Sequence, residues 1–246
     1  MTRPLLLLFG ALLLTGFTET APPRAVDPAE AARQGSELVG KILALQPSQN
    51  YTNTGVLKVR PDRGEWTETP LRFAVLVTPT NWQSVYQTTS TNQCSALRVI
   101  SAAGTPKVFL LQTNSDSEQV SLANSERFQP FAGSDFWVGD LGLDFLQWPG
   151  QKLVKSELRK TRLCRVLEST PAQPATNGYS RVMSWIDSES FGLVHADAYD
   201  AAGKILKEFD PKSVKEIDGQ PQLLKMEMYN RQTRSRSQIE FDLPVE

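Results

Sequence analysis

Hydrophobic and polar residues follow two periods along the chain, a helical one near the start and an alternating one after it. The segment Asp27-Pro28-Ala29-Glu30 offers an N-cap residue, a proline at the first helical position and an acid for a capping box. Apolar residues then recur at helical spacing at Leu38, Val39, Ile42 and Leu45. The pattern predicts one amphipathic helix from Asp27 to about Gln46.

From residue 54 onward, apolar and polar positions alternate with a period of two, as expected for strands with one buried face. Turn-forming residues such as Pro61-Asp62-Arg63-Gly64 and Asn177-Gly178 separate the alternating runs. The predicted strands cover residues 54–60, 71–77, 82–88, 94–100, 107–113, 152–157, 161–167, 179–187, 193–200, 205–209, 224–228 and 239–243. So many strands with so few helices favour one large curved antiparallel sheet or an open barrel.

An aromatic segment from Phe131 to Trp148 interrupts the strands. Leu141, Phe145 and Trp148 would share one helix face, so we expect a short inserted helix there. The sequence shows no internal repeat and no long linker, which favours a single domain over residues 22–246.

The N-terminus has the pattern of a secretory signal peptide. Met1-Thr2-Arg3 precedes an apolar run from Leu5 to Leu14, and polar and small residues follow up to Ala21. The apolar run is well short of the ~20 residues that span a bilayer, so we expect residues 1–21 to be cleaved and the protein not to be integral to a membrane. Leu14-Thr15-Gly16 resembles the start of a lipobox, but Phe17 replaces the lipid-modified cysteine. The sequence therefore predicts an exported, soluble protein of the periplasm.

The composition argues against several classes of function, among them nucleic-acid binding and metal binding. Lys+Arg 26 against Asp+Glu 27 gives a net charge of -1, which argues against the basic surface that nucleic acids require. One histidine and two cysteines are too few for a His-rich site or a zinc finger, and we predict no metal and no cofactor. In an oxidising compartment Cys94 and Cys164 could form a disulfide, or they could be two separate buried thiols, and the sequence leaves both possibilities open.

Three motifs occur in order in the second half: Gly133-Ser134-Asp135-Phe136 through Asp140-Leu141, then Trp185-Ile186-Asp187, then the stretch from Tyr199 to Lys207. Together they resemble the LolA-like family of outer-membrane lipoprotein-sorting proteins, and the ending from Met226 to Leu243 resembles its last hairpin. The resemblance extends over about Leu38 to Leu243 and is best after Phe131. It is to the broad family, because no arginine here matches the arginine hook of the dedicated carrier.

This resemblance implies an incomplete, strongly bent antiparallel β-barrel, with an N-terminal helix and a short inserted helix closing an apolar cavity for lipid acyl chains. It implies a periplasmic carrier or chaperone whose partners are lipid or lipoprotein acyl chains, an inner-membrane exporter and an outer-membrane receptor. Burying an acyl chain contributes roughly 0.8 kcal/mol per methylene, so such a carrier needs no catalytic residue.

Alternate strand positions supply candidates for lining the cavity: Phe73, Val75, Val77, Trp82, Tyr86, Met183, Trp185, Met226 and Met228. The inserted segment supplies candidates for a lid: Phe136, Trp137, Leu141, Phe145 and Trp148. The same side chains could fill an ordinary core, and the inserted helix could be packed permanently on the sheet. The sequence does not decide between these alternatives.

His195 and Asp197 share one face of a predicted strand, as in some hydrolase sites. The sequence contains no Gly-x-Ser-x-Gly, Ser-x-x-Lys or His-Glu-x-x-His motif, so we predict that the protein is not an enzyme. A basic stripe from Lys152 to Arg165 could face anionic headgroups or an acidic partner, although a solvated strand face has the same composition. The main alternative to a lipid carrier is a periplasmic adaptor that docks on an inner-membrane exporter and has a filled core.

Overall fold

The computed structural model describes residues 27–89, 94–173, 177–217 and 220–242, without the side chains of residues 215–222. The predicted signal peptide (residues 1–21), with Phe17, and also Leu243 lie outside the described residues. Every helix within the described ranges is too short or too polar to cross a bilayer.

The elements follow the predicted order. The first half contains α1 (Pro28–Leu43), β1 (Tyr51–Arg60), β2 (Thr67–Val77), β3 (Trp82–Thr89), β4 (Cys94–Ser101), β5 (Val108–Gln112) and β6 (Val120–Ser121). Short helices follow, namely η1 (Asn124–Phe128), α2 (Val138–Leu141) and η2 (Asp144–Gln147). The second half contains β7 (Gly150–Arg159), β8 (Arg162–Thr170), β9 (Arg181–Asp187), β10 (Leu193–Tyr199), β11 (Ile205–Ile217), β12 (Gln220–Asn230) and β13 (Arg236–Phe241).

All strands of the described ranges belong to one 13-stranded sheet, in the order β6-β5-β4-β3-β2-β1-β13-β12-β11-β10-β9-β8-β7. The chain runs outward from β1 to β6, crosses to the opposite edge at β7, and returns strand by strand until β13 pairs with β1. Each half is thus an antiparallel meander, which suits hairpins with short turns. The β1–β13 ladder joins the two halves through pairs from Gly55↔Phe241 to Arg60↔Arg236.

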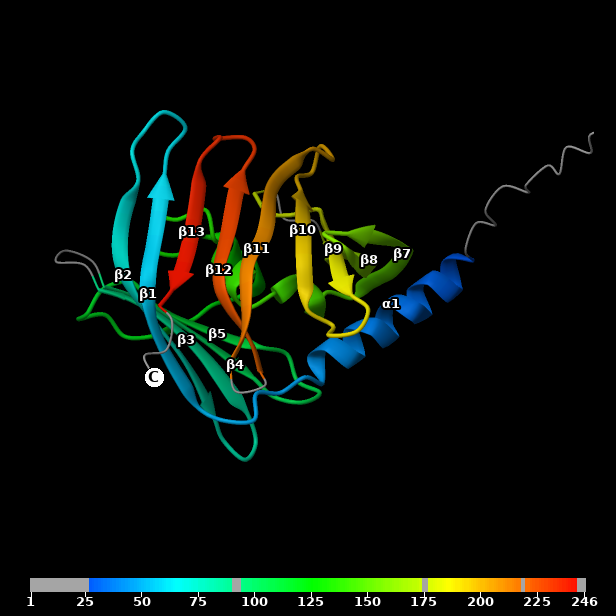
Figure 1. Ribbon diagram of the computed structural model, residues 1–246, viewed down its shortest axis with the longest axis horizontal. Coiled ribbons are helices and arrows are strands. Elements are labelled where there is room, and N and C mark those ends of the chain that lie inside the picture. Colours follow the sequence, from blue (N-terminus) through cyan, green and yellow to red (C-terminus); the bar gives the residue numbers. More distant parts are fainter. Residues whose placement is uncertain (1–26, 90–93, 174–176, 218–219, 243–246) are drawn as a thin grey trace, which may run out of the picture.

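The sheet bends strongly without closing. β10 to β13 and β1 stand side by side in Figure 1, whereas β3, β4 and β5 run beneath them at a steep angle. Register shifts in the β7–β8, β9–β10, β10–β11 and β11–β12 ladders add local bends, as bulges do. The edge strands β6 and β7 do not pair with each other. The predicted fold, a mainly β, incomplete and strongly bent antiparallel barrel, is confirmed.

Helix α1 packs against β7 at one end of the sheet (Figure 1). The Asp27 carboxylate accepts a hydrogen bond from the Ala29 amide at 3.1 Å, as the predicted N-cap should. Leu38 and Val39 are buried, and Gly35 lies so close to β7 that a Cβ would come within 2.7 Å of the Gln151 backbone. The helix ends at Leu43, a few residues before the predicted end.

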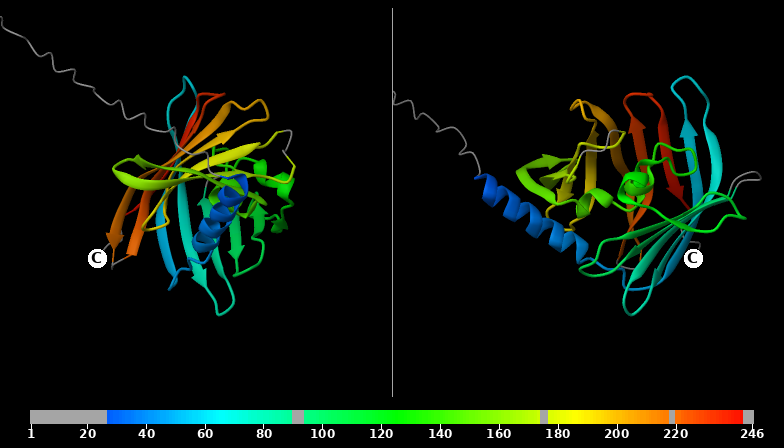
Figure 2. Two further views of the ribbon diagram at one scale, coloured as in Figure 1. Left: turned by 90° about the vertical axis from the view of Figure 1, so that its right-hand side faces the viewer. Right: turned by 180° about the vertical axis from the view of Figure 1, so that it is seen from behind.

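The connection between the two sheet edges, residues 122–149, is here called the crossing segment. It lies over the concave face, in front of the strands when the molecule is seen from behind (Figure 2, right). The prediction of one helix is wrong for this segment, because Leu143 adopts φ 49° and separates α2 from η2. Gly142 lies against the Phe109 ring, where a Cβ would come within 2.4 Å, so the chain follows the core surface closely there.

Candidate functional site

A cavity of about 560 Å³ lies between the concave face and the crossing segment. Its buried end is lined by apolar side chains from β3, the crossing segment, β11 and β12, among them Tyr86, Leu141, Leu143, Phe209 and Met226. The volume falls within the range typical of small-molecule sites.

The cavity opens through a gap in the sheet between β10 and β11. These strands pair only from Ala196↔Phe209 to Tyr199↔Ile205, although β10 begins at Leu193 and β11 continues to Ile217. The residues that flank this gap also line the cavity: Gly192, Leu193 and Val194 on one side and Pro211, Lys212 and Val214 on the other. Lys160 and Arg162, at the tip of the β7–β8 hairpin, complete the rim. The mouth therefore combines apolar and cationic groups.

The structure brings only some of the predicted cavity residues together. Tyr86 and Met226 line the cavity, and Met228 lines a small void beside it. The Phe73 ring centroid lies 4.7 Å from that of Tyr86, within the core cluster of the same sheet face. Val75 is buried, and Val77 is half-buried at the end of β2.

Three predicted cavity residues lie elsewhere. Trp82 lines a second pocket of about 430 Å³ between α1, β3 and the β4–β5 loop. Met183 and Trp185 alternate with Val182 and Ile186 on β9, and only Val182 and Ile186 belong to the core cluster beneath α1. Assigning Met183 and Trp185 to the cavity was wrong, because both faces of β9 carry apolar residues and the alternation does not say which face is concave.

The predicted lid residues are packed into the core. Phe136, Leu141 and Phe145 are buried, and of the five candidates Leu141 alone lines the main cavity. Trp137 stacks on Tyr179 with ring centroids 4.6 Å apart, and the Trp148 indole lines the second pocket. The packing favours the alternative that the sequence left open, a permanent cover.

A buried polar cluster links the crossing segment, which covers the cavity, to β11. The Lys207 ammonium donates to the Asp135 carbonyl at 2.6 Å, lies 3.8 Å from the Asp140 carboxylate, and sits 3.4 Å from the Trp137 ring centroid. The Tyr179 hydroxyl donates to Asp140 at 2.9 Å. Burial lowers the pKa of Lys207 to about 8 and raises the pKa of Asp140 and of Tyr179.

The sequence analysis did not identify Lys207, although its position in the alternating pattern indicates burial. Lys207 and Phe209 share one face of β11 by alternation, and Phe209 packs against the core, so a lysine stands at a core-facing position. A charge there needs a buried partner, and the partners come from the crossing segment.

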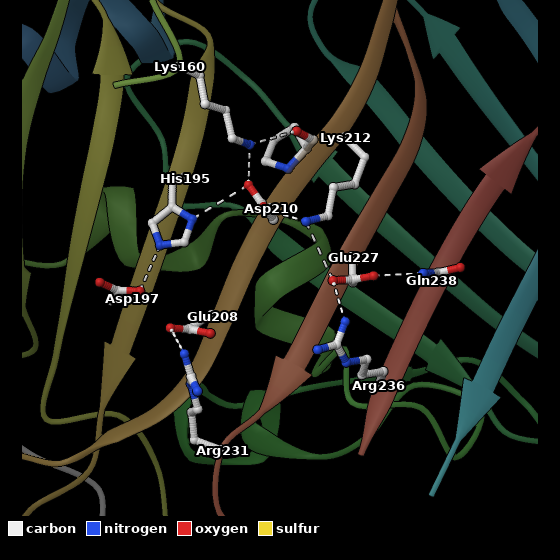
Figure 3. Close-up of polar contacts among 11 residues, drawn as sticks. Lys160, His195, Asp197, Glu208, Asp210, Lys212, Glu227, Arg231, Arg236 and Gln238 are labelled. Atoms are coloured by element: carbon white, nitrogen blue, oxygen red, sulfur yellow. Dashed lines mark hydrogen bonds and ion pairs between the residues drawn. The ribbon is translucent and has the colours of Figure 1, made fainter. Parts of the chain in front are cut away.

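The opposite face of the sheet carries a ladder of charged groups (Figure 3). His195 Nε2 lies 2.8 Å from Asp197 and Nδ1 lies 3.6 Å from Asp210. Asp210 also pairs with Lys160 and Lys212. Burial lowers the pKa of His195, but the hydrogen bond to Asp197 and the nearby Asp210 carboxylate outweigh this effect, and the net shift of the pKa is upward. Both ring nitrogens thus face carboxylates, an arrangement that holds charge and activates no nucleophile.

The two cysteines are not joined. Cys94 on β4 and Cys164 on β8 are free thiols near opposite ends of the strand order, so the disulfide that the sequence allowed is not formed in this structure. Burial raises the pKa of the Cys164 thiol.

Comparisons with known proteins agree with this fold. A family model described as "-like: Uncharacterized protein" matches residues 114–244. A DUF1329 family protein from Desulfovibrio piger superposes with a TM-score of 0.70 at 17% identity, covering 88% of this chain and 95% of that one. A comparison with curated protein sequences found no significant match.

Two further solved structures have similar folds. An outer membrane lipoprotein-sorting protein domain from Vibrio parahaemolyticus has a TM-score of 0.68 at 17% identity, covering 87% of this chain and 95% of that one. A LolA superfamily protein from Nitrosomonas europaea has a TM-score of 0.57 at 16% identity, with coverage of 87% and 95%. At these identities the likeness shows a shared fold.

Proposed function

The chain belongs to the family of uncharacterized proteins whose model matches residues 114–244. Because it also shares its fold with an outer membrane lipoprotein-sorting protein domain and a LolA superfamily protein, we propose that it is a periplasmic carrier that shelters the acyl chains of a lipid or lipoprotein. In this proposal residues 1–21 direct export and are removed. An inner-membrane exporter would supply the cargo and an outer-membrane receptor would accept it.

The observation that supports this function is the open cavity of about 560 Å³ with an apolar interior. Each methylene buried there contributes roughly 0.8 kcal/mol, so a chain of several methylenes binds without polar recognition. Tyr86, Leu141, Phe209 and Met226 surround the interior, and the gap between β10 and β11 gives a chain a way in.

The adaptor alternative requires a filled core, and the cavity argues against it. The core clusters on both sides of the cavity are well packed, with Phe109, Phe131 and Phe136 fully buried. Empty volume in such a core is costly, so a cavity of this size is expected to serve a ligand.

Native mass spectrometry of the protein purified from a bacterial periplasm tests the proposal. We expect co-purifying mass of about one lipid, which extraction would identify, or uptake of added phospholipid or lipopeptide. A bare mass together with failure to take up either lipid would overturn the carrier function and favour the adaptor.

A variant that fills the cavity sharpens the test. Leu223 on β12 lines the cavity and is half-buried, so Leu223→Trp should occupy part of the acyl-chain volume. We expect at least about tenfold weaker displacement of an apolar fluorophore by fatty acids. Leu76→Trp, on β2 away from the cavity, is the matched control. Equal displacement of the fluorophore by fatty acids in both variants would place the ligand elsewhere.

A further inference from the structure

The β7–β8 hairpin concentrates positive charge. From Gly150 to Thr170 the hairpin has two acids, Glu157 and Glu168, and six basic residues, a local charge of +4: Lys152, Lys155, Arg159, Lys160, Arg162 and Arg165. The whole chain has a net charge of -1, so the rest of it amounts to -5. This contrast sets the hairpin apart electrostatically from the rest of the molecule.

The same hairpin exposes two leucines. Leu158 is 75% exposed and Leu163 is 55% exposed, and they stand directly opposite each other across the ladder. Directly paired residues share a face, and the Ser156↔Arg165 pair two positions along shares it too. An exposed apolar pair with an arginine beside it is the composition of a surface that enters a lipid interface.

The hairpin is held beside the cavity mouth. At its tip Lys160 pairs with the Asp210 carboxylate and donates to the Pro211 carbonyl of β11 at 3.3 Å. The Leu163 carbonyl accepts from the Ser188 amide in the β9–β10 turn at 2.9 Å. The exposed leucines are therefore fixed next to the gap through which the cavity opens.

We propose that this hairpin docks the cavity mouth onto an anionic lipid bilayer, with Leu158 and Leu163 entering the headgroup layer. Arg165 on the leucine face and Arg162 on the cavity rim then face lipid phosphates, while Lys160 keeps the hairpin on β11. The docking places the gap between β10 and β11 against the membrane surface, so that an acyl chain passes between bilayer and cavity without crossing open water.

Charge and area favour a bilayer over a protein partner. Two leucines supply far less apolar area than the ~1,000 Å² or more that a specific protein interface buries. An anionic surface instead rewards each lysine or arginine near it separately. The side chains of Lys152, Lys155 and Arg162 are between 50% and 56% exposed, and their ion pairs at the surface are weak, so they can reach headgroups by extending their stems.

Vesicle flotation tests the proposal with the exported protein. We expect binding to an equimolar mixture of phosphatidylcholine and phosphatidylglycerol, little binding to phosphatidylcholine alone, and release by added salt. Leu158→Ser with Leu163→Ser should weaken binding more than about tenfold. Arg162→Gln with Arg165→Gln should weaken it roughly 25-fold, at about fivefold for each charge.

Matched controls separate docking from folding. Leu76→Ser and Arg63→Gln change an exposed leucine and an exposed arginine on the other half of the sheet, and they should bind vesicles like the parent. Thermal unfolding of each variant checks that it is folded. Binding that ignores lipid charge, or hairpin variants that bind like the controls, would overturn the proposal.

Two further outcomes are decisive. Size-exclusion chromatography showing a dimer that depends on Leu158 and Leu163 would assign the patch to a second copy of the chain and overturn membrane docking. Docking does not require cargo, so a protein that floats with anionic vesicles but takes up no acyl chain would retain this inference and lose the carrier function.

Discussion

The buried ion pair between Arg127 and Asp144 offers a direct test of whether the crossing segment is a fixed cover. The Arg127 Nη1 atom lies 2.6 Å from the Asp144 carboxylate, and the two side chains are only 11% and 9% exposed. The guanidinium also stacks 4.4 Å above the Phe109 ring of β5. The pair thus links η1, η2 and the sheet, and Arg127→Met should detach this link.

The expected loss of stability follows from the burial of the two charged side chains. In Arg127→Met the Asp144 carboxylate keeps the Trp148 indole donor at 3.3 Å but loses its countercharge. Breaking one side of a buried pair costs about 3–5 kcal/mol, and water recovers little of it because neither group is exposed. For a chain of this length the melting temperature should fall by roughly 6–20 °C.

A second substitution isolates the charge. Arg127→Met combined with Asp144→Asn removes both charges and keeps an acceptor for the Trp148 indole. Because the uncompensated carboxylate is then gone, we expect the double variant to be more stable than Arg127→Met alone, by about 1–3 kcal/mol.

Urea unfolding followed by tryptophan fluorescence measures these differences, since Trp137 and Trp148 lie within the crossing segment. Arg33→Met is the control, because Arg33 pairs with Glu30 on the exposed surface of α1 and its loss should leave the urea midpoint close to that of the parent. The reasoning fails if Arg127→Met unfolds like Arg33→Met and the double variant gains nothing. The crossing segment would then be a loosely held lid.

Two further predictions concern the sheet junction and alkaline pH. Gly55→Ala should cost about 2–4 kcal/mol, because a Cβ there would lie 2.1 Å from the Glu240 carbonyl oxygen in the β1–β13 ladder. Gly40→Ala, in open space on α1, should gain up to ~1 kcal/mol, and equal urea midpoints for the two variants would contradict the described register. Burial lowers the pKa of Lys107 and of Lys207 from 10.5 to about 8, so the unfolded chain binds more protons between these values and the free energy of unfolding should rise with pH there. Burial raises the pKa of Tyr86 and of Tyr179, which should reverse the slope above about pH 10. Urea titrations at stepped pH measure the profile, and a flat profile from pH 8 to about pH 10 would show that these lysines are not buried.

The strands could be predicted because each has one face in the core. Leu57 and Val59 on β1 alternate with Lys58 and Arg60, and Ile239 on β13 stands between polar residues, so the period of two is visible without any knowledge of the partner strands. The N-cap of α1 was predicted for a similar reason, since capping is local chemistry. The prediction of one helix for the crossing segment failed because the path of this segment is set by the concave surface. Gly142 and Leu143 bend where the Phe109 ring leaves no room for a continuous helix.

The cavity is harder to predict from the sequence than the strands are. Alternation divides a strand into two faces but does not name the concave one, and β9, whose two faces both carry apolar residues, therefore misled the assignment of Met183 and Trp185. Met226, by contrast, has the charged opposite-face neighbours Lys225 and Glu227, which leaves one choice of face, and it lines the cavity.

The mouth depends on where pairing stops, and pairing is a property of two strands together. The sequence of β11 continues as a strand to Ile217 beyond its last partner on β10, and nothing in either segment alone marks the point of divergence. Two lysines of β11 lie on either side of the point where its pairing with β10 stops. Lys207 faces the core on the paired part of β11, where the cover is fastened, and Lys212 faces the mouth just beyond it. The cover is thus fixed to the same strand whose far end forms the opening, so cargo can enter through the gap while the cover stays in place.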